Sequence, residues 1–142
     1  RNMYHAVVLA YGAGAGKRLS IPGKDMGNVV SARDFVNWYN GHPLGNRVDL
    51  KLEHVKDVVI CGLGNVALDC ARILLKDPVK DLHPTDISSR AVEALKHASI
   101  ENVRIVSRRG PAQAACTPKE LRELVGLPDV GVSILLADCL LT

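Results

Sequence analysis

The chain has 142 residues, a length that suits one domain with a sizeable buried core. Its composition of 47% hydrophobic and 23% charged residues is close to the average for soluble α/β proteins, which argues against a disordered chain. The net charge of +3 fits an anionic cofactor and an acidic protein partner but is too small to indicate nucleic-acid binding, and no apolar run is long enough to cross a bilayer.

The first predicted element is a strand over Tyr4–Tyr11, because a continuous apolar run is typical of a strand buried on both faces of a parallel sheet. The stretch Gly12–Lys17 then imitates a phosphate-binding loop. A Walker loop would need a glycine and a Ser or Thr where this chain has Tyr11 and Arg18. We therefore interpret the stretch as a flexible turn and expect Lys17→Ala to leave nucleotide affinity unchanged.

A short amphipathic helix is predicted over residues 31–39, with Ser31 as its N-cap and a stop at Asn40–Pro43. It carries Phe35 and Trp38, the only Phe and the only Trp of the chain. We favour packing of this helix on a sheet over stacking of its rings on a ligand. The polar, turn-rich stretch that follows leads to the next strand.

The central predicted unit is a strand over residues 58–61, a glycine turn and a helix that ends at Asp77–Pro78. The turn reads G-x-G-x-x-A: Gly62 makes the turn, Gly64 lets a pyrophosphate approach the backbone, and Ala67 lets the helix pack closely on the strand. The N–H groups at the start of the helix would face the anion. The pattern favours nucleotide binding, although a tight turn that binds nothing has the same form.

A second helix is predicted over residues 85–97, followed by a strand over Asn102–Val106 that ends in Ser107–Gly110. In a dinucleotide fold the end of this strand meets the adenine ribose, where an acidic residue reads a free 2′-hydroxyl and arginine accommodates a 2′-phosphate. Arg108 and Arg109, with no acid beside them, favour NADP over NAD by roughly tenfold or more, because guanidinium bonds to phosphate are charge-assisted. The alternative is a solvated basic turn.

The last predicted helix begins with a capping box at Thr117–Glu120, with Pro118 in its first turn and Gly126 as its stop. Its apolar face is formed by Leu121, Leu124 and Val125. Residues 132–136 are predicted as a last strand.

The cysteines are scattered, with no C-x-x-C pair, so we expect small core residues in a reducing compartment and neither a zinc site nor a disulfide framework. They are Cys61, Cys70, Cys116 and Cys139. The five histidines are dispersed, and we expect most of them at the surface.

Several longer strings are more specific than the glycine pattern. GLGNVALDCARILL, VRIVSRRGP and CTPKELRELVGLP occur in this order, after VVLAYGA, IPG and FVNWYNGHP. From Tyr4 to about Pro128 they resemble the adrenodoxin reductase family, the mitochondrial NADPH–ferredoxin reductases. The resemblance implies an α/β, Rossmann-like three-layer domain with a mainly parallel sheet, a fragment of a two-domain flavoprotein. Residues 1–16 would be the last strand and turn of the FAD-domain part, and residues 17–142 an incomplete NADP-binding domain.

The resemblance also implies a function. This chain would be the NADP(H)-binding part of an enzyme in which NADPH passes hydride to FAD, and FAD passes electrons singly to a [2Fe-2S] ferredoxin that serves mitochondrial cytochromes P450 and steroid metabolism. The implied location is mitochondrial, in the matrix or at the inner membrane, with peripheral membrane association of the parent protein. We expect the fragment alone to be monomeric and inactive, with no catalytic base and no nucleic-acid partner.

The glycine turn and the resemblance together place five residues around the pyrophosphate: Gly62, Leu63, Gly64, Asn65 and Val66. Arg108 and Arg109 would bind the 2′-phosphate. By resemblance, Glu120 would contact the nucleotide and Arg122 would belong to the basic surface that docks ferredoxin.

Leu63 departs from the family, which commonly has Gln between the two glycines. Because backbone N–H groups mainly hold the pyrophosphate, we expect binding to survive this change, with a side-chain hydrogen bond lost.

Two other functions compete with this interpretation. The first is a non-enzymatic sensing or interaction module that binds NADP and acts through a partner. The second, weaker one is a nucleic-acid surface, which lacks the interleaved aromatic residues that base stacking needs. Its basic residues would be Arg104, Arg108, Arg109, Lys119 and Arg122.

Overall fold

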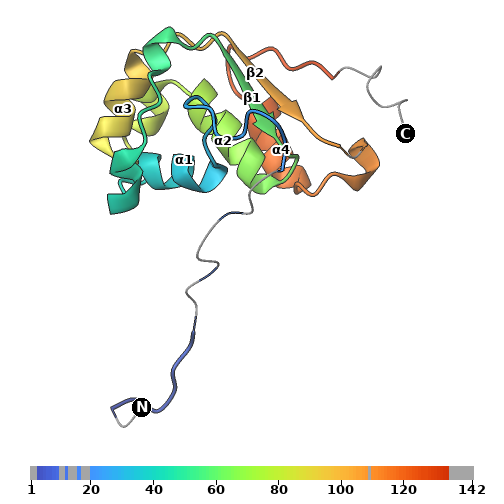
Figure 1. Ribbon diagram of the computed structural model, residues 1–142. Coiled ribbons are helices and arrows are strands. Elements are labelled where there is room, and N and C mark those ends of the chain that lie inside the picture. The colour runs from blue at the N-terminus through green and yellow to red at the C-terminus, as the bar shows by residue number, and fades with distance from the viewer. Residues whose placement is uncertain (1–2, 10–11, 13–15, 17–19, 109, 135–142) are drawn as a thin grey trace.

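The computed structural model covers residues 1–142 and describes residues 3–9, 12, 16, 20–108 and 110–134. Lys17, Arg109 and Cys139 lie outside the described residues, so the predictions for their side chains stay predictions. The described part contains four α-helices and one small parallel sheet, and the helices lie on one side of the sheet (Figure 1). No helix of that part is long and apolar enough to span a membrane.

Two strands form the sheet, β1 (Asp57–Cys61) and β2 (Asn102–Val106), and they pair in parallel. Cys61 lies opposite Val106, so both strands end at the same edge. Parallel neighbours need a long crossover connection, which the segment between Cys61 and Asn102 supplies with two helices. The strands predicted over residues 58–61 and 102–106, and the parallel α/β arrangement, are therefore confirmed.

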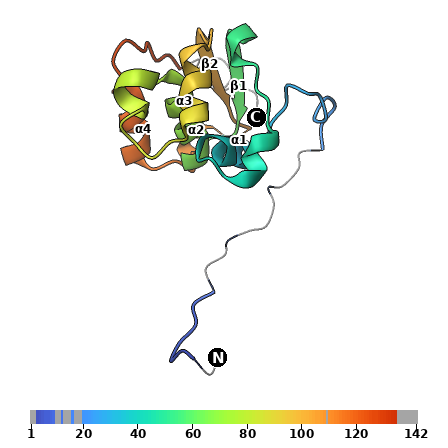
Figure 2. The same ribbon diagram turned by 90° about the vertical axis from the view of Figure 1, so that its left-hand side faces the viewer.

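Helix α2 (Asn65–Leu75) begins directly after the glycine turn and packs against both strands. Its residues Ala67, Leu68, Cys70 and Ala71 are buried, which spreads the apolar surface over two sides of the helix. One side faces α1 (Ala32–Tyr39), and the other faces α4 (Pro118–Val125). Figures 1 and 2 show α2 between these neighbours, with α3 (Ser89–Lys96) beside α1. Helix α2 is thus the central element of the fold.

The first hydrophobic cluster joins α1, α2 and α3. The rings of Phe35 and Trp38 stack with centroids 5.6 Å apart, and both side chains are buried. Ser31 caps α1 by accepting a hydrogen bond from the Asp34 N–H at 3.1 Å. These contacts confirm the predicted helix. Its aromatic residues pack mainly against α2 and α3, however, and not on the sheet as predicted. The buried members of the cluster are Phe35, Trp38, Leu52, Cys70, Leu82, Ala91 and Leu95.

The second hydrophobic cluster fixes α4 to α2. Its buried members are Leu68 and Ala71 of α2 and Leu124 of α4. Val103 and Ile105 pack against it from the inner face of β2. Helix α4 therefore belongs to the same core as the glycine turn and the sheet.

The predicted helix over residues 85–97 begins only at Ser89, with Ser88 as its N-cap. The Ser88 hydroxyl accepts from the Ala91 N–H at 3.3 Å. The Thr85 hydroxyl instead donates to the Leu82 carbonyl at 2.7 Å and closes the preceding turn. Because Thr85 is engaged with the segment before it, the helix starts at the next available cap.

The segment between α2 and α3 contains a π-helical turn over Pro78–Leu82. Its N-cap is Asp77, whose carboxylate accepts from the Val79 and Lys80 N–H groups at 2.8 and 2.9 Å. These bonds to Lys80 and Val79 hold the pKa of Asp77 below its usual value of 3.8. Elsewhere, short 3-10 helices cover Pro43–Arg47, Leu52–His54 and Pro111–Gln113.

Two strand predictions are wrong over their described residues. Residues 4–9 and 132–134 form no strand. A strand requires a partner for its backbone groups, and among the described residues β1 and β2 pair only with each other. The described part of the first run, drawn in blue, lies away from the helices, with Val8 and Leu9 exposed (Figures 1 and 2).

The outer face of the sheet is open in the described part of the chain. Side chains alternate along both strands, so Ile60 and Ile105 face the helices while Val59 and Val106 are exposed. The same alternation exposes Cys61, so its predicted place in the core is wrong.

Candidate nucleotide-binding site

The two segments singled out for nucleotide binding meet at the carboxyl ends of the strands. The Gly62 N–H donates to the Val106 carbonyl at 2.8 Å, which continues the sheet ladder into the glycine turn. Arg108, two residues beyond Val106, has an exposed side chain. Residues that are more than 40 positions apart in the chain therefore lie at one edge, as the strand order predicts. Ligands of open α/β sheets bind at this edge.

The glycine turn has the backbone geometry that its residues predict. Gly62 has φ +128°, a region that disfavours residues with a Cβ. Gly64 is the N-cap of α2, and no side chain caps the helix there. A Cβ added at either glycine would meet no described heavy atom within 4 Å, so the space over the turn is open. Ala67, in the first turn of α2, is buried. The first turn of α2 therefore packs closely on one side, while the side over Gly62 and Gly64 is free of described atoms.

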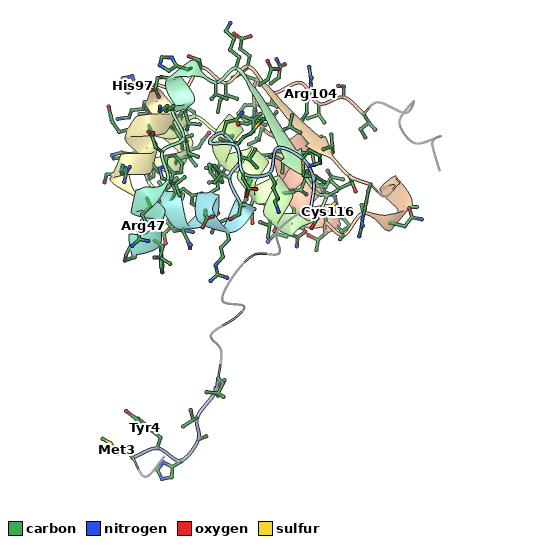
Figure 3. The ribbon with its side chains drawn as sticks, viewed as in Figure 1. Met3, Tyr4, Arg47, His97, Arg104 and Cys116 are labelled. Atoms are coloured by element: carbon green, nitrogen blue, oxygen red, sulfur yellow. The ribbon has the colours of Figure 1, made fainter. Side chains whose placement is uncertain are left out.

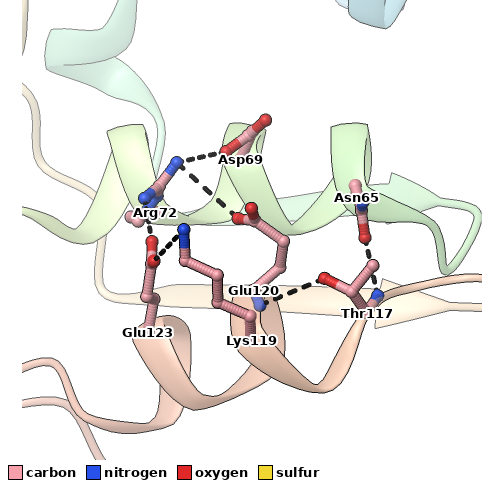
Figure 4. Close-up of polar contacts among 7 residues, drawn as sticks. All are labelled: Asn65, Asp69, Arg72, Thr117, Lys119, Glu120 and Glu123. Atoms are coloured by element: carbon pink, nitrogen blue, oxygen red, sulfur yellow. Dashed lines mark hydrogen bonds and ion pairs between the residues drawn. The ribbon is translucent and has the colours of Figure 1, made fainter.

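The segment after the arginines returns to the glycine turn. The Ala115 N–H donates to the Leu63 carbonyl at 3.1 Å, and Gly64 and Ala115 form a parallel bridge. The Asn65 side-chain oxygen accepts from the Thr117 N–H at 2.7 Å (Figure 4). The first residue of α2 is thereby bonded to the N-cap of α4, so the two helix N-termini are linked.

Leu63 has a structural explanation. Its side chain is partly buried and packs against the second hydrophobic cluster. An apolar residue between the glycines therefore helps to fix the turn on α2 and α4.

The predicted capping box at the start of α4 is only half formed. The Thr117 hydroxyl accepts from the Glu120 N–H at 3.4 Å, which confirms the N-cap. The reciprocal bond to the Thr117 N–H is made by Asn65 in place of Glu120. The Glu120 carboxylate lies 3.9 Å from an Arg72 guanidinium nitrogen instead. A tertiary contact has replaced the local one.

An ion-pair cluster around Arg72 was not predicted from the sequence. One Arg72 nitrogen bonds Glu123 at 2.5 Å, and the other bonds Asp69 and approaches Glu120 (Figure 4). Lys119 lies 3.9 Å from Glu123 on the outer side. The spacing of Asp69 and Arg72 on one helix gave a local signal, but the two glutamates come from a helix about 50 positions later.

The remaining residues of interest lie apart from this cluster. Arg122 is exposed on α4. Arg104 lies on the open face of β2, and Cys116, just before the N-cap of α4, is partly buried (Figure 3). Cys70 is buried beside α1, and burial, reinforced by the charge of Asp69, raises the pKa of its thiol to about 11.

Comparison with known proteins identifies relatives of the chain. No protein-family model matches it. It is 49% identical over 142 residues to the mitochondrial NADPH:adrenodoxin oxidoreductase of Arabidopsis thaliana, covering 100% of this chain and 29% of that protein. The Homo sapiens protein of the same name is 49% identical over 128 residues, 90% of this chain and 26% of the relative. NADPH-ferredoxin reductase FprA of Mycobacterium tuberculosis is 51% identical over 131 residues, 92% of this chain and 28% of the relative.

A solved structure supports the same relationship. Mycobacterium tuberculosis FprA in complex with NADPH matches with a TM-score of 0.79 and 50% identity, over 84% of this chain and 26% of that one. The chain thus spans between a quarter and three-tenths of the length of these relatives. The chain is homologous to a segment of the NADPH:adrenodoxin oxidoreductases, the family that its motifs resemble.

Proposed function

We propose that this chain is the NADP(H)-binding part of a flavoprotein reductase that takes electrons from NADPH and delivers them to a [2Fe-2S] ferredoxin. The observation that carries the proposal is the convergence of the glycine turn and Arg108 at the carboxyl edge of the sheet. The homology to NADPH:adrenodoxin oxidoreductases, and to a reductase solved with NADPH, supports it.

The glycine turn fits a pyrophosphate. The open space over Gly62 and Gly64 lets the ligand approach the backbone, and α2 presents a helix N-terminus without a side-chain cap. We propose that the backbone N–H groups of Leu63, Asn65 and Val66 donate hydrogen bonds to the pyrophosphate. Anion binding at this helix end is favoured further by the helix dipole.

The segment with Arg108 and Arg109 would determine whether the site prefers NADP or NAD. Arg108 and Arg109 would donate to the 2′-phosphate of NADP, which NAD lacks. Glu120 would contact the nucleotide through a donor such as a hydroxyl or an amino group, because an ionised carboxylate only accepts hydrogen bonds. None of these residues acts as a base, and their work is to bind and orient the cofactor.

The rest of the longer protein would supply the flavin and complete the reaction. When bound there, FAD would supply the chemistry that accepts an electron pair and passes electrons on singly. We assign Arg122, which is exposed on α4, to the surface that docks the acidic ferredoxin. The relatives named mitochondrial support a mitochondrial location for this protein. The matrix or inner-membrane location, and cytochromes P450 and steroid metabolism downstream, are part of the proposal that the resemblance implies.

We further propose the division into residues 1–16, which belong to the FAD-domain part, and residues 17–142, the NADP-binding domain. The exposed apolar side chains of Val7, Val8 and Leu9 support it, because such a run needs a partner to be covered.

Isothermal titration calorimetry tests the proposal. We expect the chain to bind NADP at least about tenfold more tightly than NAD at the same ionic strength. Arg108→Ala should remove most of this preference while leaving the weaker NAD binding unchanged. Arg104→Ala is the matched control, since it removes an arginine from the open face of β2, the strand that leads to Arg108. Equal affinities for the two dinucleotides would contradict the proposal.

A further inference from the structure

The Arg72 cluster lies between the central helix and the helix that carries Glu120. Three carboxylates surround one guanidinium group whose side chain is only 26% exposed. They are Asp69, Glu120 and Glu123. Lys119 adds a second positive charge at the edge of the cluster, at 3.9 Å from Glu123, but its side chain is 81% exposed. Arg72 is therefore the main charge that compensates this acidic group.

The two ends of the Arg72 guanidinium face different partners. One nitrogen bonds Glu123 at 2.5 Å, while the other bonds Asp69 and lies 3.9 Å from Glu120. The fork geometry of arginine allows this division, whereas the single nitrogen of lysine could not reach both sides at once. The contact joins α2 to α4 across about 50 positions of sequence.

Three further contacts hold the same two helices together. The Asn65 side chain accepts from the Thr117 N–H where α2 and α4 begin, and Leu124 packs with Leu68 and Ala71. Arg72 adds a contact to α4 further along both helices, through Glu123. Its guanidinium group also lies 3.9 Å from the Glu120 carboxylate.

We propose that Arg72 is a positioning residue for NADP binding: it holds α4 against α2, and it keeps the carboxylates of Glu120 and Glu123 compensated beside a site that receives an anionic ligand. This inference rests on the proposed function. Without Arg72, three carboxylates share one partly buried position, and their repulsion turns Glu120 away from its place. The same negative charge then opposes the phosphates of the cofactor.

The test compares Arg72→Gln with the double variant Arg72→Gln/Glu123→Gln. We expect the single variant to bind NADP about three- to tenfold more weakly, as for coupled partners in one ion-pair network. The double variant should recover at least half of that loss on a logarithmic scale, because it removes one uncompensated carboxylate. Arg104→Gln is the control that should bind as tightly as the wild type, and Glu123→Gln alone completes the double-mutant cycle.

Amide hydrogen exchange without ligand provides the second measurement. Arg72→Gln should accelerate exchange over Glu120–Val125 while α1 stays protected, and Arg72→Lys, which keeps a charge on the same helix, should give a smaller change. A folded Arg72→Gln that binds NADP like the wild type contradicts the inference alone. So does a double variant with no recovery. A wild-type chain that does not bind NADP contradicts the proposed function and this inference with it.

Discussion

The attachment of α4 to α2 can be measured by truncating Leu124. This side chain is 7% exposed and packs in the second cluster with Leu68 and Ala71. Replacing a buried leucine by alanine removes its burial and leaves a cavity, at a cost of about 2–5 kcal/mol. Among the described residues this cluster has three buried members, so its surroundings can partly close the cavity. We therefore expect Leu124→Ala to lower the free energy of unfolding by about 2–3 kcal/mol.

Leu121 of the same helix supplies a matched control. It is 43% exposed, and Leu121→Ala makes the same change of residue type, so helix propensity cancels from the comparison. Its loss should be about 0.5–1 kcal/mol, in proportion to the smaller area that it buries. Urea unfolding followed by circular dichroism gives both values. Equal losses, or a loss below about 1 kcal/mol for Leu124→Ala, would refute the packing of α4 described above.

Three further predictions concern other parts of the fold. A Cβ at Gly45 would lie 2.5 Å from α1 backbone atoms, so Gly45→Ala should cost about 2 kcal/mol or more in urea unfolding, while Gly27→Ala, in open space, should change stability by less than about 0.5 kcal/mol. The raised thiol pKa of Cys70, about 11, and its burial should prevent alkylation of the folded chain at about pH 8. Exposed Cys61 should react, and mass spectrometry that finds both labelled at one rate would contradict this. The pKa of Asp77 is lowered, so its ionised form stabilises the folded chain above pH 3.8 and this advantage is lost as the pH falls through the lower folded value. The stability difference between the wild type and Asp77→Asn should therefore shrink on acidification; a constant difference would contradict it.

Local patterns predicted much of this fold because they depend on neighbours in sequence. A continuous apolar run predicted β1, and β-branched residues at the centre of a short stretch predicted β2. Hydroxyl caps such as Ser31 and Thr117 predicted helix starts. The glycine turn was predicted at the place where it is found, and the observed φ of +128° at Gly62 explains why glycine stands there. The meeting of this turn with Arg108 followed from parallel strand order.

What the sequence did not predict depends on contacts between distant residues. Only one of the two capping-box bonds forms, because Asn65 accepts the bond from the Thr117 N–H that the motif assigns to Glu120. The Glu120 carboxylate lies near Arg72 instead. Helix α3 starts late because Thr85 is engaged with the preceding turn. Nothing in the local sequence distinguishes these outcomes from their alternatives.

The N-terminal strand failed for a related reason. An apolar run becomes a strand only when a sheet edge is available to it, and none of the described residues pairs with residues 4–9. The apolar composition of residues 4–11 indicates that another element packs on this run, but it does not indicate which element.

The most direct test of the account is a titration of the ¹⁵N-labelled chain with NADP, followed by NMR. The central claim is that residues far apart in the sequence form one nucleotide site at the carboxyl edge of the sheet. It predicts the largest amide shift changes at Gly62–Val66, at Arg108 and at Glu120, with little change in α3. Shift changes centred on α3, or no changes in a folded chain at saturating NADP, would contradict it.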